Sequence, residues 1–388
     1  MASVYFFTFS RSDYASLRPV MRASLQDAAI TTKIVAGGSH LLQRYGNSIA
    51  QIRKDGLPIH DTMDFLREQD DTPQQIAAAY ARAASEAVRI LSEGNPDYVF
   101  ILGDRWEMLP VANAASMLHI PIVHHSGGDI TQGSADNQTR YALSCLAHLH
   151  LTALPEHSMR LLAMGEESWR VLTTGEPALT ELSAYANTVP DIRKALGLKP
   201  KEPFVLATFH PTSFDSVLPE KQIDVFLAAL DVIRDTIILT APNPDQDSRI
   251  FFEKLKAYAE KHTHVYLHEN LGAEKYYAAM ASALYMIGNS SSGLWEAPSF
   301  RLPVVNIGAR QQGRVHGDNV VHAPLELAAI KDAIQTVSSA DFRDVLSDNN
   351  PYVQSNTLTL ILDTLKKPHD KSRLVAKRFV DPLHVRAH

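Results

Sequence analysis

The sequence predicts an α/β protein built from two doubly wound parallel sheets. Two observations carry this prediction. Short β-branched or aromatic runs alternate with helical segments along most of the 388 residues, and several of these runs end at a polar, glycine-flanked cluster. A chain of this length exceeds one ordinary core and suits two domains of under about 200 residues each.

The first half of the chain contains six runs that we interpret as strands. They are Val4–Phe9, Thr32–Ala36, Tyr98–Leu102, Ile122–His124, Leu149–Ala153 and Val171–Thr174. Helical stretches separate them, such as Gln74–Glu93 with its alanines and spaced apolar positions. Strands and helices in alternation predict right-handed βαβ units with helices on both faces of a parallel sheet.

A change of composition around Asn187–Glu202, where prolines and a glycine lie among charged residues, marks the best domain boundary. A second alternation follows, with strands expected at Phe204–Thr208, Thr236–Thr240, His264–His268, Tyr285–Ile287 and Val304–Ile307. The tail, Pro351–Leu365 and onward to Arg386, is expected to be helical and then basic. We expect an N-terminal domain over 1–187, a C-terminal domain over 188–365 and a tail over 366–388.

Composition excludes several classes of protein. The net charge of −6 argues against a nucleic-acid or anionic-membrane surface, which needs a basic excess. The single cysteine, Cys145, excludes a disulfide framework and a cysteine-based zinc site, and favours a reducing compartment. The sequence shows no signal-like segment and no apolar run of the ~20 residues that span a bilayer. We therefore expect a cytoplasmic protein.

The polar clusters follow the ends of the expected strands. In parallel sheets, ligands lie outside the carboxyl ends of strands, where helix N-termini direct N–H groups at anions. The clusters are Ser10-Arg11-Ser12-Asp13, Gly103-Asp104-Arg105, His125-Ser126-Gly127-Gly128-Asp129, Phe209-His210-Pro211-Thr212 and Gly288-Asn289-Ser290-Ser291-Ser292-Gly293. Together they predict a site for a phosphate and a sugar.

Single clusters leave alternatives open. Arg11 could meet a phosphate or be the surface partner of a capping Asp13. Asp104 and Arg105 directly follow a buried strand, where charged groups are costly unless they are used. Adjacent histidines on a strand, such as His124 and His125, point to opposite faces, which disfavours joint metal binding. We expect no metal and no cofactor.

The serine run after Asn289 offers hydroxyl and N–H groups for a phosphate, although a serine-rich turn is often an ordinary cap. Glu296 follows within two helical turns, where a carboxylate can bind sugar hydroxyls.

Several dispersed motifs now resemble one family. Gly288-Asn289-Ser290-Ser291-Ser292-Gly293 with Glu296-Ala297-Pro298, then Val305-Asn306-Ile307-Gly308 and Arg310-Gln311-x-Gly313-Arg314, closely resemble the hydrolysing UDP-N-acetylglucosamine 2-epimerases that begin sialic-acid synthesis. The clusters at Arg11, Asp104 and Asp129, with Arg140, His148-Leu149-His150 and His210-Pro211, fall in the family's order. The resemblance runs from about Val4 to His322.

The resemblance implies a GT-B fold: two Rossmann-like domains, the nucleotide sugar in the cleft and a C-terminal helix that returns to the first domain. It implies that UDP is bound by Arg11, Arg105, His210, Asn243, Ser290, Ser291, Glu296 and Arg310. It implies catalytic roles for Asp104 and Asp136, whose positions match family carboxylates, and we expect Asp129 and His210 to be further catalytic residues. The alternatives are a helix cap for Asp136 and a salt bridge with Arg105 for Asp104. Homodimers or homotetramers are usual in such a family.

The sequence also departs from the family near the sugar. Ser126 stands where many relatives carry a glutamate and some a histidine, and a serine is no acid or base near neutral pH. Asp129 replaces the usual glutamate, Tyr141 a histidine and Cys145 a lysine. The UDP-binding motifs are kept while the sugar pocket is altered.

Three functions therefore remain open. The first is hydrolysing 2-epimerisation of UDP-N-acetylglucosamine or of a UDP-2,4-diacetamido-trideoxy sugar of the legionaminic-acid type. The second is glycosyl transfer on the same fold, and the third is binding of a UDP-sugar without chemistry. The Asn-Ser-Ser-Ser-Gly and Arg-Gln-x-Gly-Arg strings favour the hydrolysing branch over epimerases that return UDP to the sugar.

Overall fold

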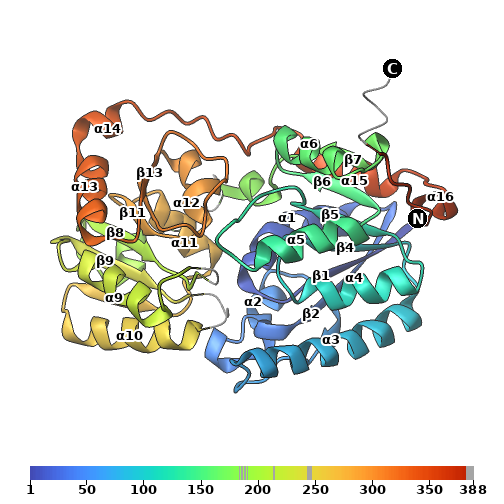
Figure 1. Cartoon of the computed structure of the whole chain (residues 1–388), viewed down its shortest axis with the longest axis horizontal. Helices are drawn as coiled ribbons and strands as arrows, with labels where there is room; N and C mark the ends of the chain where they lie inside the picture. The colour runs from blue at the N-terminus through green and yellow to red at the C-terminus, as the bar shows by residue number, and fades with distance from the viewer. Residues whose placement is uncertain are drawn as a thin grey trace. The chain divides into compact units, whose positions relative to one another are not determined.

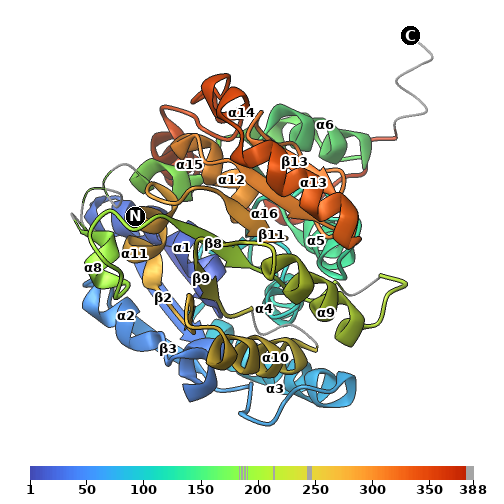
Figure 2. The same ribbon diagram turned by 90° about the vertical axis from the view of Figure 1, so that its left-hand side faces the viewer.

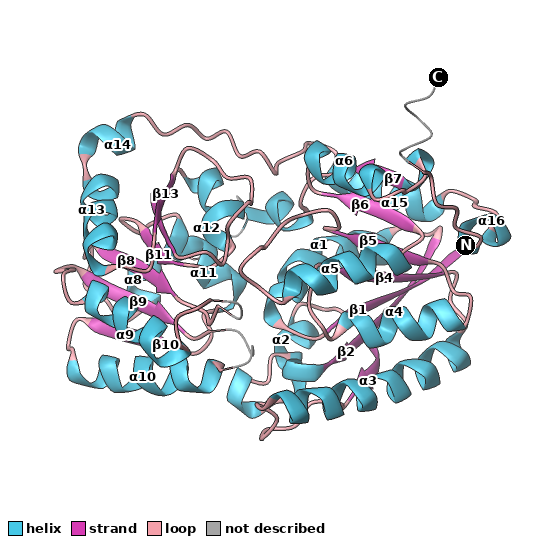
Figure 3. Ribbon diagram, viewed as in Figure 1, coloured by secondary structure: helices cyan, strands magenta, loops and turns pink. Residues whose placement is uncertain are grey.

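The computed structural model describes residues 1–182, 184, 187, 189, 191–212, 215–242 and 247–381. The described chain forms two parallel sheets flanked by helices (Figures 1 and 3). It divides into two compact units: unit 1 comprises Met1–Asp129, Asp136–Thr180 and Tyr352–His388, and unit 2 comprises Ile130–Ala135 and Glu181–Pro351. The predicted α/β class with two doubly wound sheets is confirmed.

Unit 1 contains a seven-stranded sheet in the order β3-β2-β1-β4-β5-β6-β7, and all of its pairings are parallel. Its strands are β1 (Ala2–Thr8), β2 (Ile30–Gly37), β3 (Ile59–Met63), β4 (Tyr98–Leu102), β5 (Ile122–His125), β6 (Leu149–Thr152) and β7 (Val171–Thr173). Its helices are α1 (Arg11–Gln26), α2 (Ile49–Lys54), α3 (Pro73–Gly94), α4 (Met108–Met117), α5 (Asp136–Leu146), α6 (Pro155–Ala163), α15 (Thr357–Lys366) and α16 (Lys371–Val375).

Apolar side chains of the central strands are buried on both faces of this sheet. Along β1, Val4 and Phe6 belong to one core cluster, while Tyr5 and Phe7 belong to the other. The second cluster contains residues of α3 and α4, and the first contains residues of α1 and α15. Period-2 alternation with both faces apolar is the pattern of a parallel strand covered by helices on each side.

Unit 2 contains a six-stranded parallel sheet in the order β10-β9-β8-β11-β12-β13. Its strands are β8 (Phe204–Thr208), β9 (Thr236–Thr240), β10 (Val265–His268), β11 (Met286–Gly288), β12 (Val304–Ile307) and β13 (Val320–Ala323). Its helices are α8 (Ile192–Ala195), α9 (Pro219–Leu230), α10 (Ser248–Lys261), α11 (Gly272–Met280), α12 (Ser292–Trp295), α13 (Leu327–Ser338) and α14 (Ala340–Asp344). Helices α9, α10 and α13 share one core cluster with its strands (Figure 2).

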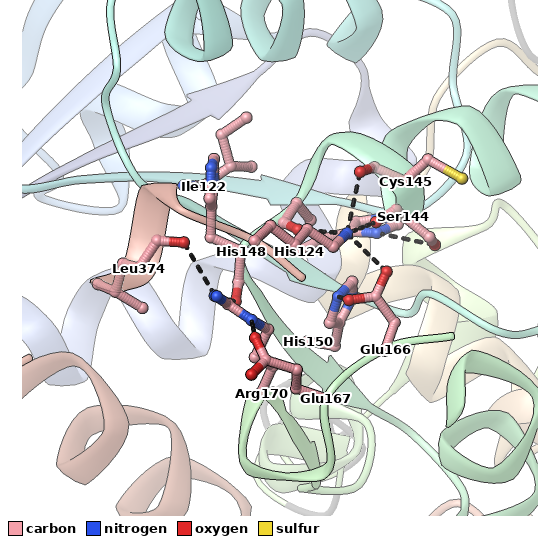
Figure 4. Close-up of polar contacts among 12 residues, drawn as sticks. Ile122, His124, Ser144, Cys145, His148, His150, Glu166, Glu167, Arg170 and Leu374 are labelled. Carbon is pink, nitrogen blue, oxygen red and sulfur yellow. Dashed lines mark hydrogen bonds and ion pairs between the residues drawn. The ribbon is translucent and has the colours of Figure 1, made fainter. Parts of the chain in front are cut away.

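The last described part of the chain packs within unit 1. Ile361, Leu365 and Leu374 are buried in the cluster that contains α1. The buried guanidinium of Arg170 donates from Nη1 to the carbonyl oxygens of His148, at 3.0 Å, and Leu374, at 2.9 Å (Figure 4). A charged group that donates to several main-chain carbonyls fixes this segment against β6 and β7.

All eleven strands predicted from the sequence are confirmed, with ends within about two residues, as boundary shifts of this size are usual. The edge strands β3 and β13 were missed. β3 is Ile-His-Asp-Thr-Met, which is only half apolar, and β13 is a four-residue run that is mostly partly exposed. Within the described part of the chain, every helix is too short or too polar to span a bilayer.

Candidate functional site

The carboxylate of Asp104 follows β4 and is held by a buried cation. Its ion-pair partner is Arg140 on α5, whose side chain is 1% exposed. Asp104 itself is 21% exposed, so one end of the pair reaches the surface of unit 1 while the other is buried. The buried charge of Arg140 needs its partner, because it would otherwise be uncompensated. The ion pair therefore holds the Asp104 carboxylate beside Arg140. The structure thus pairs Asp104 with Arg140, a cation that the sequence did not suggest for it.

Arg105 pairs with the buried Glu107, a residue outside the motifs that the sequence analysis identified. Nη2 of Arg105 lies 2.8 Å from Oε1 of Glu107, and both side chains are buried. Burial raises the pKa of the Glu107 carboxyl, and the charge of Arg105 acts in the opposite sense. The pair holds the guanidinium in one orientation at the end of β4, as a positioned anion-binding group requires.

Asp13 caps helix α1, which was one of the two alternatives considered for this cluster. Its carboxylate accepts the backbone N–H groups of Phe9 and Ser10, each at 2.7 Å. Burial raises the pKa of Asp13, and the charge of Arg105 opposes this rise. Arg11 opens the same helix and helps lower the pKa of the buried His40 to about 3, for which burial is the main cause. Arg11 and Arg105 therefore both lie near the capped N-terminus of α1, which follows β1.

The segment after β5 carries the second predicted carboxylate. Asp129 is 1% exposed, and its Oδ1 lies 3.4 Å from Nε2 of His157 on α6. The preceding His124 contacts the Gly103 carbonyl through Nε2 at 2.7 Å, which ties the end of β5 to the residue before Asp104. Because Gly103 supplies only an acceptor, Nε2 of His124 carries the proton. Burial lowers the pKa of His124 to about 3, so its ring is neutral at pH 7.

Asp136 is the first residue of α5 and is partly exposed. Arg140, the partner of Asp104, lies four residues further along the same helix, so the two side chains project from one helix face. Ser144 follows after four more residues, and its hydroxyl lies 3.3 Å from Nδ1 of His124 (Figure 4). Helix α5 thus connects the ends of β4 and β5.

In unit 2, the side chain of Asn289 organises the predicted nucleotide-binding residues. Its Oδ1 accepts the backbone N–H of His210 at 2.7 Å, and its Nδ2 donates to the His210 carbonyl at 2.8 Å. The Asn289 carbonyl accepts Nη1 of Arg310 at 3.3 Å and Nε2 of Gln311 at 2.8 Å. The side-chain amide and the backbone carbonyl of this one buried residue therefore join the ends of β8, β11 and β12, where His210, Ser290 and Arg310 lie.

The serine run forms a hydroxyl network beside β11. Ser292 Oγ lies 2.8 Å from Ser290 Oγ and 2.7 Å from the hydroxyl of Tyr276 on α11. Helix α12 spans only Ser292–Trp295, so hydroxyl and turn N–H groups, rather than the dipole of a long helix, are what this cluster offers a phosphate. Glu296 ends that helix, and its charge lies close enough to raise the pKa of the Tyr276 hydroxyl, although burial is the larger cause.

The structure brings the predicted residues together in two groups. Unit 1 gathers Arg11, Asp104, Arg105, Asp129 and Asp136, and unit 2 gathers His210, Ser290, Ser291, Glu296 and Arg310. Asn243 lies outside the described residues. Among the described residues, no cluster of three or more histidine, cysteine or acidic side chains offers a metal site.

Sequence reasoning missed the supporting residues, Glu107, His157 and the bridging role of Asn289. Only Asn289 carried a signal, because an amide directly after a strand can bridge neighbouring strand ends.

Two parallel sheets, each flanked by helices, are the architecture of the GT-B class of enzymes. The chain belongs to the UDP-N-acetylglucosamine 2-epimerase family, whose sequence profile matches residues 22–366. The chain is 33% identical over 338 residues to the GDP/UDP-N,N'-diacetylbacillosamine 2-epimerase (hydrolyzing) of Campylobacter jejuni, covering 86% of this chain and 87% of that one. It is 31% identical over 362 residues to the polysialic acid biosynthesis protein P7 of Escherichia coli, covering 92% of both chains.

Solved structures agree with this assignment at the level of the fold. The UDP-GlcNAc 2-epimerase of Neisseria meningitidis bound to UDP-GlcNAc has a TM-score of 0.81 and 17% identity, covering 95% of this chain and 100% of that one. The resemblance to hydrolysing members of the family and the GT-B fold class are both confirmed. The chain is a UDP-sugar 2-epimerase.

Proposed function

We propose that the chain is a hydrolysing 2-epimerase, which converts a UDP-2-acetamido sugar into the free 2-epimer and UDP. The observation that carries this proposal is the half-buried Arg140–Asp104 ion pair at the end of β4. It fixes one carboxylate at the sheet edge, and Asp129 and Asp136 follow from the segment after β5. Removal and delivery of protons at a carbon atom need such positioned carboxylates.

The reaction has two stages. The C1–O bond to UDP breaks and the C2 proton leaves, which gives a glycal. Water then adds at C1, and C2 is protonated from the opposite face. Both stages pass through positive charge on the sugar, and the first also develops negative charge on the leaving diphosphate. Carboxylates beside the ring therefore lower both barriers, and cations at the diphosphate lower the first.

The family resemblance names cations and hydroxyl groups for the diphosphate within each of the two groups. Arg11 and Arg105 in unit 1 and Arg310 in unit 2 are the proposed charges, because guanidinium groups match phosphate oxygens in a bidentate manner. His210, Ser290 and Ser291 are the proposed hydrogen-bonding partners, and Glu296 is proposed to accept from the ribose hydroxyls. Asn243 is kept as a proposed UDP contact from the family resemblance alone.

The sugar is the open part of the proposal. Two relatives favour a diacetamido substrate: the Campylobacter protein and the UDP-N,N'-diacetylbacillosamine 2-epimerase (hydrolyzing) of Legionella pneumophila, which is 33% identical over 332 residues, with 84% of this chain and 86% of that one covered. The UDP-N-acetylglucosamine 2-epimerase of Neisseria meningitidis is 25% identical over 384 residues, with 98% of this chain and 99% of that one covered. We propose a UDP-2,4-diacetamido-trideoxy sugar as the first choice and UDP-N-acetylglucosamine as the second.

The decisive experiment incubates the full chain in D₂O with each UDP-sugar in turn and follows the products by proton NMR. Free 2-epimer with deuterium at C2, together with UDP, supports the proposal, and the faster of the two substrates identifies the sugar. A UDP-linked 2-epimer instead marks an epimerase that returns UDP to the sugar. Binding without turnover marks a UDP-sugar-binding protein, and transfer that requires an added acceptor marks a glycosyltransferase.

We also propose a homodimer or homotetramer, as the family resemblance implied, and a cytoplasmic location. Light scattering coupled to size exclusion measures the mass directly: a particle of 42.9 kDa is a monomer and contradicts the first of these proposals.

A further inference from the structure

The hydroxyl of Ser126 lies between a histidine and a glutamate. Ser126 Oγ is 2.8 Å from Nδ1 of His125 and 3.4 Å from Oε2 of Glu176, which follows β7. All three side chains are almost fully buried, with 1% exposed for Ser126 and Glu176 and none for His125. Ser126 directly follows β5, at the carboxyl edge of the sheet, where ligands of parallel sheets bind.

Counting protons decides the direction of these contacts. The Gly175 carbonyl, 3.1 Å from Nε2 of His125, can only accept, so Nε2 carries the proton of the neutral ring. Burial lowers the pKa of His125 to about 4, so the ring is neutral at pH 7. Its Nδ1 then carries a lone pair. The single proton of the Ser126 hydroxyl can go to this nitrogen at 2.8 Å or to Glu176 Oε2 at 3.4 Å, and the shorter contact favours His125. A hydroxyl that donates to a neutral imidazole is the arrangement that activates serine oxygens elsewhere.

Glu176 is fixed by its own backbone. Its N–H donates to the Tyr352 carbonyl at 3.1 Å, and its Oε1 accepts the Ala178 N–H at 3.4 Å. The carboxylate therefore stays beside the Ser126 oxygen. A negative charge at this place stabilises the positive charge that forms when a proton passes from Ser126 to His125.

The backbone of Ser126 is strained. Its φ of +64° lies in the left-handed region, which favours glycine and costs a serine about 1 kcal/mol. The next two residues are glycines, yet a serine occupies the strained position. Strain of this kind at a residue other than glycine indicates that its side chain has a function.

We propose that Ser126 and His125 form a proton relay that removes the C2 proton of the UDP-sugar, with Glu176 as its positioning residue. This inference rests on the proposed function. The C2–H bond breaks and its proton joins Ser126 Oγ while the former hydroxyl proton passes to His125 Nδ1. The electron pair becomes the C1=C2 bond of the glycal, and UDP leaves with the electrons of the C1–O bond. His125 returns the proton to solvent after the product leaves, and Asp136 serves the opposite face of C2.

Ser126→Gly tests the relay without adding backbone strain, because glycine suits the positive φ of this position. We expect kcat to fall by about 10²-fold, as losses of acid–base groups do, with KM within threefold of wild type. The kinetic isotope effect of a C2-deuterated substrate on UDP release should rise, because C–H cleavage becomes slower relative to the other steps. A purely structural serine would not change that isotope effect.

Glu176→Gln keeps the side-chain shape and removes the charge. It should lower kcat by about tenfold and also raise the isotope effect. The matched control is Glu167→Gln, which removes the partner of Arg170 and should leave the isotope effect unchanged. A Ser126→Gly enzyme within threefold of wild type overturns the relay, and a Glu176→Gln enzyme at the wild-type rate overturns the role of Glu176. Wild-type protein that releases no UDP from either sugar overturns the proposed function itself, a result distinct from both.

Discussion

Replacing His40 with glutamine should make unit 1 more tolerant of acid. His40 is 0% exposed, and its ring nitrogens lie 2.9 Å from Thr8 Oγ1 and 2.7 Å from Ser48 Oγ. Burial, helped by the charge of Arg11, lowers its pKa from 6.5 to about 3. Between about pH 3 and 6.5, His40 is therefore neutral in the folded state and protonated in the unfolded chain.

The sign and the magnitude follow from proton linkage. A lowered folded-state pKa means that the stability is fully present above pH 6.5 and is lost as the pH falls toward 3. Each pH unit well inside that window costs about 1.4 kcal/mol, so His40 removes about 2 kcal/mol between pH 7.5 and 5. A glutamine does not titrate, so the variant should lose about 2 kcal/mol less than wild type over this interval, whatever its stability at neutral pH.

The assay is urea unfolding at several pH values, followed by pulsed hydrogen exchange of peptides from β1, which report unit 1 alone. His60→Gln is the control, because His60 lies in the same unit and is exposed. Equal pH slopes for wild type and His40→Gln would refute the reasoning, since they would mean that the folded protein accepts the proton.

Other substitutions test the proposed site. Arg310→Ala should weaken UDP binding by calorimetry more than it slows saturated turnover, because its charge serves the diphosphate in ground and transition states alike; an unchanged KM with a collapsed kcat would contradict this. Asp104→Asn should cut kcat by about 10²-fold or more, and a variant within threefold of wild type makes the residue structural. Asp136→Asn should abolish deuterium incorporation at C2 and leave UDP affinity within a few-fold, and the opposite result with Asp129→Asn would reverse the two aspartates.

The sequence was a good guide to the sheets because their strands are buried on both faces. Runs such as Tyr98–Leu102 and Phe204–Thr208 are buried throughout and almost entirely apolar, and glycine or polar clusters follow them, so two independent signals mark each strand. The edge strand Ile59–Met63 lies beside a single neighbour and keeps polar side chains, so its composition did not distinguish it from a loop.

The ends of the strands were predictable, but the pairing between side chains was not. An ion pair between Asp104 and Arg105 was one alternative that the sequence left open, and the structure pairs Asp104 with Arg140 and Arg105 with Glu107. The position of Arg140 depends on how α5 packs beside β5, which no local pattern encodes. Glu176 was missed for a related reason, because its proximity to Ser126 requires β5 and β7 to lie in one sheet with β6 between them.

The return of the chain to unit 1 has a consequence for its synthesis on the ribosome. Unit 2 draws nearly all of its residues from one continuous stretch, Glu181–Pro351, whereas unit 1 needs residues from both sides of that stretch. Its core lacks Ile361, Leu365 and Leu374, and Arg170 lacks the Leu374 carbonyl, until the final tenth or so of the polypeptide has emerged. During translation, unit 2 can therefore finish folding before unit 1. Until then, the apolar side chains of unit 1 that pack against α15 and α16 stay exposed.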